Sequence, residues 1–302
     1  MDRAEAHRLK CSPTVWEQGT HKWVSIGIQS AFRVFPWERV FPKVIAECDE
    51  AIRKNPRDAK AYTRRGWVRI AENKSDQAIA DLTEAIRLDS KSFRNHLFRA
   101  EAFCVKKERD HAIADYAEAI RLRPDHASAY LGRGVCYEDM RDYNRAIEDY
   151  TETIRLNSSE SSAFYRRAFA YRNQRANDRA IADYDAVIRL DPRNASAYAA
   201  RGQCNLTKNK LEAASLDFAQ ALRLDPKRIS AYQGCAAIFA LKKQYYLAIS
   251  YLDEVVRLEP TDPVHYFNRA SVFCQAGQYD RAITDCNEAI RLNPKLAPAF
   301  YN

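Results

Sequence analysis

A period of 34 residues runs through most of this 302-residue chain. The segment AIADYAEAIRLRPDHASAY at residues 112–130 returns as AIADYDAVIRLDPRNASAY at residues 180–198, two periods later. One position of the period can be followed without an insertion at Pro56, Ser90, Pro124, Ser158, Pro192, Pro226, Pro260 and Pro294. A fixed period of this length indicates stacked repeats, because one such unit is too small to bury a core alone. It argues against independent globular domains.

Each unit is predicted to contain two helices. Apolar and small residues recur at three- and four-residue spacing on both sides of a short polar break, and runs of β-branched residues are absent. In the fourth unit, the pattern predicts helices over 129–139 and 144–156. Pro192 closes the fifth unit, and a proline ends a helix because it lacks a backbone N–H and favours an extended residue before it. The chain therefore reads as a series of helical hairpins.

Small and aromatic residues alternate at fixed positions within the units. Residues a multiple of 34 apart are here said to share a register position. One position of the first helix holds Gly66, Ala100, Gly134, Ala168, Gly202, Ala236 and Ala270. Small side chains let two helices approach closely, and aromatic positions such as Tyr130 and Phe164 are expected to fill the space between neighbouring hairpins.

This arrangement resembles the tetratricopeptide repeat (TPR), a 34-residue helix-turn-helix unit. In the fifth unit the residues that carry the resemblance are Phe164, Ala168, Tyr171, Ala180, Tyr184, Val187 and Pro192. The resemblance implies an all-α fold, a right-handed α-solenoid of stacked hairpins. It also implies that the first helices line a concave groove that binds other proteins.

The register gives the expected organisation of the chain. Residues 1–40 are predicted to form an atypical N-terminal cap, because Phe32 replaces a small residue and Pro36 interrupts the helical pattern. Residues 41–58 are expected to hold the second helix of a degenerate first repeat. The seven full units are 59–92, 93–126, 127–160, 161–194, 195–228, 229–262 and 263–296. Residues 297–302 begin an incomplete further unit, and the uncapped edge beside it predicts self-association through the C-terminal repeat.

Charged residues also follow the period. One position of the first helix holds Arg65, Arg99, Arg133, Arg167, Arg201 and Arg269. One position of the second helix holds Asp81, Asp115, Asp149, Asp183, Asp217 and Asp285. The seventh unit lacks both, with Cys235 and Tyr251 in their places. We therefore expect each Arg to pair with the Asp of its own hairpin.

Composition excludes several classes of protein. No apolar stretch approaches the ~20 residues that a membrane span needs, and residues 23–32 make a poor signal peptide, so a cytoplasmic location is predicted. The eight cysteines stand singly, without metal-ligand spacing to the six histidines. The net charge of +8 forms no basic block, which makes a nucleic-acid partner a weaker interpretation. No nucleotide-binding or hydrolase motif is present, so neither a catalytic residue nor a cofactor is predicted.

The favoured hypothesis is a non-catalytic scaffold that binds a partner polypeptide in its groove. The alternatives are a nucleic-acid-binding solenoid and the regulatory repeat segment of a longer enzyme. Groove-lining residues should be those of the first helices that lie off the packing positions and differ between units. They are Lys60, Arg64, Trp67, Arg94, Phe98, Tyr165, Arg166, Phe169 and Arg172. The nearby acidic residues Glu101, Glu138 and Asp139 argue against a uniformly acidic ligand, so a partner with apolar anchors and a few carboxylates is expected.

Overall fold

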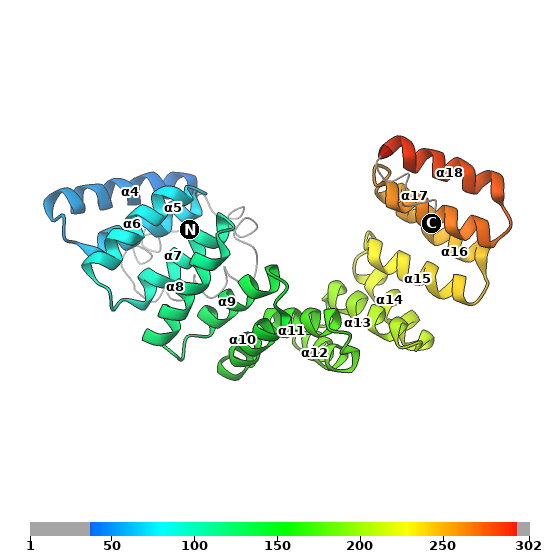
Figure 1. Cartoon of the computed structure of the whole chain (residues 1–302), viewed down its shortest axis with the longest axis horizontal. Coiled ribbons are helices and arrows are strands. Elements are labelled where there is room, and N and C mark those ends of the chain that lie inside the picture. The colour runs from blue at the N-terminus through cyan, green and yellow to red at the C-terminus, as the bar shows by residue number, and fades with distance from the viewer. Residues whose placement is uncertain (1–36, 295–302) are drawn as a thin grey trace, which may run out of the picture. The chain divides into compact units, whose positions relative to one another are not determined.

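The computed structural model describes residues 37–294, which form fifteen α-helices and no strand. The chain divides into two compact units after Ala170, within α11. Figure 1 labels the helices of both units. The first unit contains α4 (Trp37–Lys54), α5 (Ala59–Ala71), α6 (Ser75–Leu88), α7 (Phe93–Val105), α8 (Arg109–Leu122), α9 (Ala127–Asp139), α10 (Tyr143–Leu156) and most of α11 (Ser161–Asn173). The second contains α12 (Asn177–Leu190), α13 (Ala195–Thr207), α14 (Leu211–Leu224), α15 (Ile229–Leu241), α16 (Tyr245–Leu258), α17 (Pro263–Gln275) and α18 (Tyr279–Leu292).

The helices pack as consecutive hairpins, such as α5 with α6, α7 with α8 and α9 with α10 in the first unit. Within each unit, successive hairpins also contact one another, as α6 contacts α7 and α8 contacts α9 in the first unit and α14 contacts α15 in the second. In the first unit, the first helices α5, α7 and α9 touch one another in turn. In the second unit, α13 and α15 do the same. The all-α architecture of stacked helix-turn-helix hairpins is therefore confirmed.

Helix ends follow the sequence signals closely. In the fourth repeat the helices begin at Ala127 and Tyr143, one or two residues before the predicted starts. The Asp142 side chain caps α10 by accepting the N–H of Arg145 at 3.1 Å. Helix α12 ends at Leu190, and Asp191 before Pro192 is extended, with φ −138° and ψ 91°. The proline thus stops the helix by the steric effect expected of it.

The first described helix is longer than the sequence pattern predicted. We expected the helix to lie within residues 41–58, whereas α4 begins at Trp37 and includes Pro42. A proline in the second turn removes one backbone hydrogen bond, to residue 38, and the rest of the helix keeps its pairing. The predicted cap at residues 1–40 and the partial unit at 297–302 lie almost entirely outside the described residues.

Glycine permits close contact at the centre of the fourth repeat's hairpin. A Cβ atom added to Gly134 would lie 2.8 Å from a ring carbon of Tyr150, a fully buried residue of α10. Because Tyr150 cannot move within a packed core, only glycine fits at residue 134. Gly202 faces Phe218 and Gly66 faces Leu82 in the same way, so the small residues of this register position are explained by the large apolar side chains that they face.

The turn inside each hairpin contains a residue in the left-handed region. Six of these residues are not glycine, namely Asn73, Lys107, Arg141, Arg175, Asn209 and Lys243, with φ between 57° and 64°. The seventh is Gly277, with φ 72°. They share one register position, so the same turn is repeated even where the residue type is unfavourable. The mixed residue types at this position did not predict the turn.

The predicted Arg–Asp pairs form within the hairpins. In five repeats the guanidinium makes at least two hydrogen bonds to the carboxylate, in Arg65–Asp81, Arg99–Asp115, Arg133–Asp149, Arg201–Asp217 and Arg269–Asp285. Arg167 and Asp183 belong to different compact units. In the seventh repeat, Cys235 and Tyr251 join an apolar cluster with Phe218 instead.

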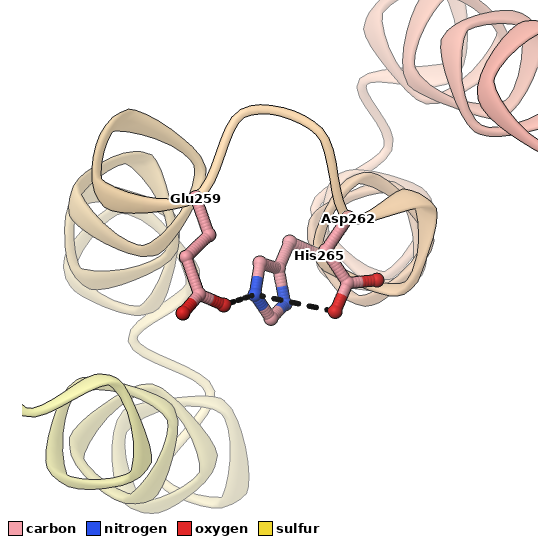
Figure 2. A group of neighbouring side chains, drawn as sticks. All are labelled: Glu259, Asp262 and His265. Carbon is pink, nitrogen blue, oxygen red and sulfur yellow. Dashed lines mark hydrogen bonds and ion pairs between the residues drawn. The ribbon is translucent and has the colours of Figure 1, made fainter. Parts of the chain in front are cut away.

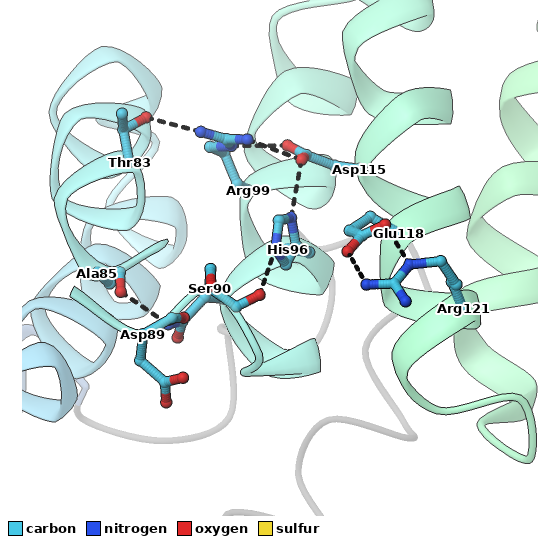
Figure 3. A network of polar contacts seen from close by, with 10 residues as sticks. Thr83, Ala85, Asp89, Ser90, His96, Arg99, Asp115, Glu118 and Arg121 are labelled. Carbon is cyan, nitrogen blue, oxygen red and sulfur yellow. Dashed lines mark hydrogen bonds and ion pairs between the residues drawn. The ribbon is translucent and has the colours of Figure 1, made fainter. Parts of the chain in front are cut away.

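Four of these five arginines also connect their hairpin to the one before it. Arg65 contacts Asp49, Arg201 contacts Asp185 and Arg269 contacts Asp253, each partner lying on the preceding second helix. Arg99 donates to Thr83 Oγ1 at 3.1 Å while holding Asp115 (Figure 3). One side chain therefore fixes both the geometry of its hairpin and the step between hairpins, a role that the sequence did not reveal.

Candidate partner-binding face

The sequence-predicted binding residues lie on three helices. Lys60, Arg64 and Trp67 are on α5, and Arg94 and Phe98 are on α7. Tyr165, Arg166, Phe169 and Arg172 are on α11, with α9 between α7 and α11 in the chain. We call the residues of α5, α7, α9 and α11 that point away from the second helices the first-helix face. Within the first unit, α5 contacts α7 and α7 contacts α9, so the face continues across repeats.

The basic residues of α5 and α7 are the most accessible of the predicted set. Lys60 and Arg94 are exposed. Arg64 is partly exposed and lies 3.3 Å from Glu47 of α4. The guanidinium of Arg94 stacks on the Phe93 ring at 5.7 Å. These contacts position the cations near the start of each first helix and leave their charge at the surface.

Two aromatic members of the predicted set serve the core. Phe98 is only 7 % exposed and belongs to a cluster with Leu82, Leu97 and Tyr116. Trp67 is partly buried and packs against the same cluster. Their burial fills the space between the second and third hairpins, so we leave both Phe98 and Trp67 out of the binding surface proposed below. Tyr165 and Phe169 of α11 are partly buried.

Helices α9 and α11 are joined by a polar link that sequence reasoning missed. Glu138 of α9 accepts a hydrogen bond from Arg166 at 3.0 Å and another from the Tyr150 hydroxyl at 2.7 Å. Burial raises the pKa of Glu138, although Arg166 and Tyr150 both oppose that effect. The neighbouring repeats have Cys104 and Arg172 at the register position of Glu138, so no recurring pattern of charges could have paired it with Arg166.

The other two acidic residues of this face are also neutralised within the chain. Burial raises the pKa of Glu101 on α7 to about 8, so its carboxyl is mostly protonated at neutral pH. Asp139 at the end of α9 forms an ion pair with Arg109, with 2.5 Å between the charged atoms. The first-helix face is thus less acidic than its sequence suggests.

A three-residue group at the junction of α16 and α17 has donor types that bind metals. His265 Nε2 lies 2.9 Å from a Glu259 oxygen and 3.7 Å from an Asp262 oxygen (Figure 2). The three donor atoms lie within 4.8 Å of one another. However, a metal on Nε2 would place the ring proton on Nδ1, which is buried and has no hydrogen-bond partner among the described residues. If Nε2 instead carries the proton and donates it to Glu259, Nδ1 has no proton, and no buried N–H lacks an acceptor.

The register explains this group without a metal. His265 occupies the position of Asn95, which is buried and donates to the carbonyls of Ala85 and Asp89 at the end of α6. His265 likewise binds Glu259, the C-cap residue of α16. Both side chains therefore tie the start of a first helix to the end of the preceding helix.

Comparison with family models decides the classification of the chain. Tetratricopeptide repeat models match residues 59–92, 127–160, 165–229 and 263–296, which together make up more than half of the sequence. The chain belongs to the tetratricopeptide repeat family. A search of curated proteins gives no match.

Solved TPR structures share the fold at low identity. YrrB, described as a TPR protein with an unusual peptide-binding site, is 21 % identical with a TM-score of 0.56, covering 61 % of this chain and 95 % of YrrB. The C-terminal part of a TPR protein from Cytophaga hutchinsonii is 17 % identical with a TM-score of 0.64, covering 76 % and 95 %. Pseudomonas aeruginosa pilF is 18 % identical with a TM-score of 0.58, covering 68 % and 95 %. These similarities establish the solenoid architecture.

Membership of this family supports a general role in protein interaction, since TPR proteins bind protein or peptide partners. Among the described residues, no helix is both long and apolar enough to cross a membrane. The identity of the binding residues is a separate question, which the geometry of the first-helix face addresses.

Proposed function

We propose that this protein is a non-catalytic scaffold that binds a segment of a partner polypeptide along its first-helix face, from the second to the fifth repeat. The binding residues are Lys60, Arg64 and Arg94, with Tyr165, Arg166 and Phe169 of α11 completing the surface. Arg172 belongs to the second compact unit and is left out of this surface. The cytoplasmic location stays a prediction from the sequence alone.

The observation that carries the proposal is the internal neutralisation of the acidic side chains on this face. Glu101 is mostly protonated, Glu138 is bound by Arg166 and Tyr150, and Asp139 is paired with Arg109. A scaffold with ionised acids along α7 and α9 would repel a carboxylate-bearing segment. Here that repulsion is reduced, and Lys60 of α5 and Arg94 of α7 are exposed at the surface.

The chemistry of the face specifies the partner. Exposed Lys and Arg side chains attract carboxylates over distances of about one Debye length, ~8 Å at physiological ionic strength. The aromatic residues of α11 offer apolar contact area, and aromatic and Arg side chains are the usual energetic centres of interfaces. We therefore expect a peptide segment that carries Asp or Glu residues toward α5 and α7 and an apolar anchor toward α11.

Affinity capture from an extract of the source cells tests this proposal. The bait is the whole chain, compared with the double variant Lys60→Glu/Arg94→Glu and with Tyr165→Ala/Phe169→Ala. The matched control is Arg87→Glu/Arg121→Glu, which makes the same charge change at exposed positions on the second helices α6 and α8. Circular dichroism verifies that every variant is folded.

We expect the same protein partner to be lost from both first-helix variants and retained by the control. Quantified with a synthetic peptide from that partner, the charge reversal should weaken binding at least tenfold, with a smaller loss at high salt. Loss of the partner only in the second-helix control would overturn the proposal. Recovery of RNA in place of a protein would favour the nucleic-acid alternative.

A further inference from the structure

The structure brings together two cysteines that are far apart in the sequence. The Sγ atoms of Cys104 on α7 and Cys136 on α9 lie 3.1 Å apart. Both residues belong to the first compact unit, and α7 and α9 are first helices of consecutive repeats. The two residues are 32 positions apart in the sequence. The contact arises where the last turns of two successive first helices meet.

The pair is a local exception to the repeat pattern. Pairs at the equivalent two positions elsewhere are Ile70/Ala102, Glu138/Ala170, Arg172/Cys204, Leu206/Ile238 and Ala240/Val272. In the other repeats, apolar, small or charged residues therefore occupy at least one of these two positions. Packing alone does not require a thiol at either position.

The surroundings of the two thiols give them different reactivities. The hydrogen bond from Cys136 lowers the pKa of the Cys104 thiol against the opposing effect of burial, and the Tyr116 hydroxyl and Arg109 act in the same direction. The hydrogen bond to Cys104, together with burial, raises the pKa of Cys136. Cys104 is partly exposed, whereas Cys136 is 1 % exposed. Cys104 is thus the more accessible of the two thiols, and the second thiol is already in contact with it.

We propose that Cys104 and Cys136 are a modification site, at which hydrogen peroxide or an alkyl hydroperoxide forms a reversible disulfide between the third and fourth repeats. The Cys104 thiolate attacks a peroxide oxygen, forming an S–O bond and breaking the O–O bond, and the departing hydroxide or alkoxide takes a proton. The Cys136 sulfur then attacks the Cys104 sulfenic acid, the S–O bond breaks, and water leaves with the Cys136 proton. Two thiols lose two electrons to one peroxide.

The disulfide would join α7 to α9 across α8, closing a loop that contains a whole second helix. In a solenoid, each repeat is held only by contacts with its neighbours, so a covalent link between first helices strengthens one junction specifically. It also removes conformational freedom from the unfolded chain. Oxidation should therefore stabilise the first compact unit.

The test is a titration of the full chain with hydrogen peroxide, followed by non-reducing peptide mapping and a thermal melt. The variants are Cys104→Ala and Cys136→Ala, because alanine stands at equivalent positions in Ala240 and Ala170. The matched control is Cys274→Ser, since Cys274 shares the register position of Cys104 and is exposed. Mapping after alkylation of the remaining thiols identifies which cysteines are linked.

We expect a peptide linked through Cys104 and Cys136 in the wild type and in Cys274→Ser. The melting temperature of the first unit should rise by about 5 °C or more on oxidation and return on addition of dithiothreitol. Neither alanine variant should show the rise. Oxidation of Cys104 to sulfinic or sulfonic acid without a link to Cys136, or links only between molecules, would overturn the proposal.

Discussion

Arg133 of α9 and Asp149 of α10 are joined by two parallel hydrogen bonds of 2.9 and 2.8 Å. Asp149 is 4 % exposed, and its burial raises the pKa of the carboxyl despite the bound arginine. The pKa of Asp115, at the same register position, is lowered instead. Burial would raise the Asp115 pKa too, but hydrogen bonds from Arg99 and from His96 at 3.2 Å together lower it. The number of hydrogen bonds that the buried carboxylate accepts therefore decides whether its pKa is raised or lowered.

Removing Asp149 alone should be costly. Asp149→Ala leaves Arg133, whose side chain is 21 % exposed, without its carboxylate partner. We expect the free energy of unfolding to fall by about 2 to 4 kcal/mol, more than the ~0 to 1 kcal/mol of a surface pair. Urea denaturation measures the loss. A double-mutant cycle with Arg133→Ala that gives no coupling would contradict a structural role for the pair.

The seventh repeat suggests a less costly change at the same place. There, Cys235 and Tyr251 replace the pair, and Tyr251 stacks on Phe239 with ring centres 5.4 Å apart. We therefore expect the double variant Arg133→Cys/Asp149→Tyr to retain more stability than Asp149→Ala, since no buried charge is left without a partner. A double variant less stable than the single one, by the same urea denaturation, would show that packing and charge are not interchangeable here.

Glu101 should make stability depend on pH. Its pKa of about 8 in the folded chain lies above the ordinary value of 4.5, so between these values the folded state holds a proton that the unfolded state has released. Stability from this residue therefore falls as pH rises from about 4.5 to 8. Glu101→Gln should remove that slope and stabilise the protein by about 1 to 2 kcal/mol at pH 8. The free energies of unfolding of the wild type and of this variant, measured at about pH 5, 7 and 8 to span that window, test the prediction.

The exposed Glu148 of α10 provides the matched control for that prediction. Glu148→Gln makes the same chemical change on a second helix. The stability of this variant relative to the wild type should not vary across the window. An equal pH-dependent gain in both variants would assign the effect to net charge.

The left-handed turn offers a matched pair of substitutions. Arg141→Gly should stabilise the fourth hairpin by about 0.5 to 1 kcal/mol, because glycine adopts a positive φ without steric cost. Gly277→Ala should destabilise the last described hairpin by about 1 kcal/mol. A Cβ at Gly277 would meet no atom within 4 Å, so only backbone strain is tested there. Hydrogen exchange of each hairpin measures both changes, and changes of the same sign would refute the explanation.

Self-association through the C-terminal repeat stays a prediction, and α18 now supplies a residue to test it. Ile283 is 59 % exposed, whereas Ile249, at the same register position of α16, is 5 % exposed in a cluster with Phe273. Ile283→Lys should lower any concentration-dependent mass seen by light scattering. Leu216→Lys, at a 74 % exposed position of α14, is the control. If both variants associate as the wild type does, α18 is not the interface.

The sequence by itself determined the repeat, its helices and its internal ion pairs. A residue such as Gly134 or Asp149 is needed in nearly every hairpin, so its contribution is repeated along the chain and can be seen as a period. Pro192 likewise ends its helix through local sterics alone. Local and periodic constraints of this kind need no coordinates.

The tertiary structure decided what is not periodic. The contact between Cys104 and Cys136, the link from Glu138 to Arg166 and the burial of Phe98 depend on which side chains meet between repeats. The protonation of Glu101 depends on the dielectric environment that neighbouring helices create. Contacts between repeats are set by helix packing in three dimensions, and the candidate binding face could be located in sequence but not described chemically until those contacts were known.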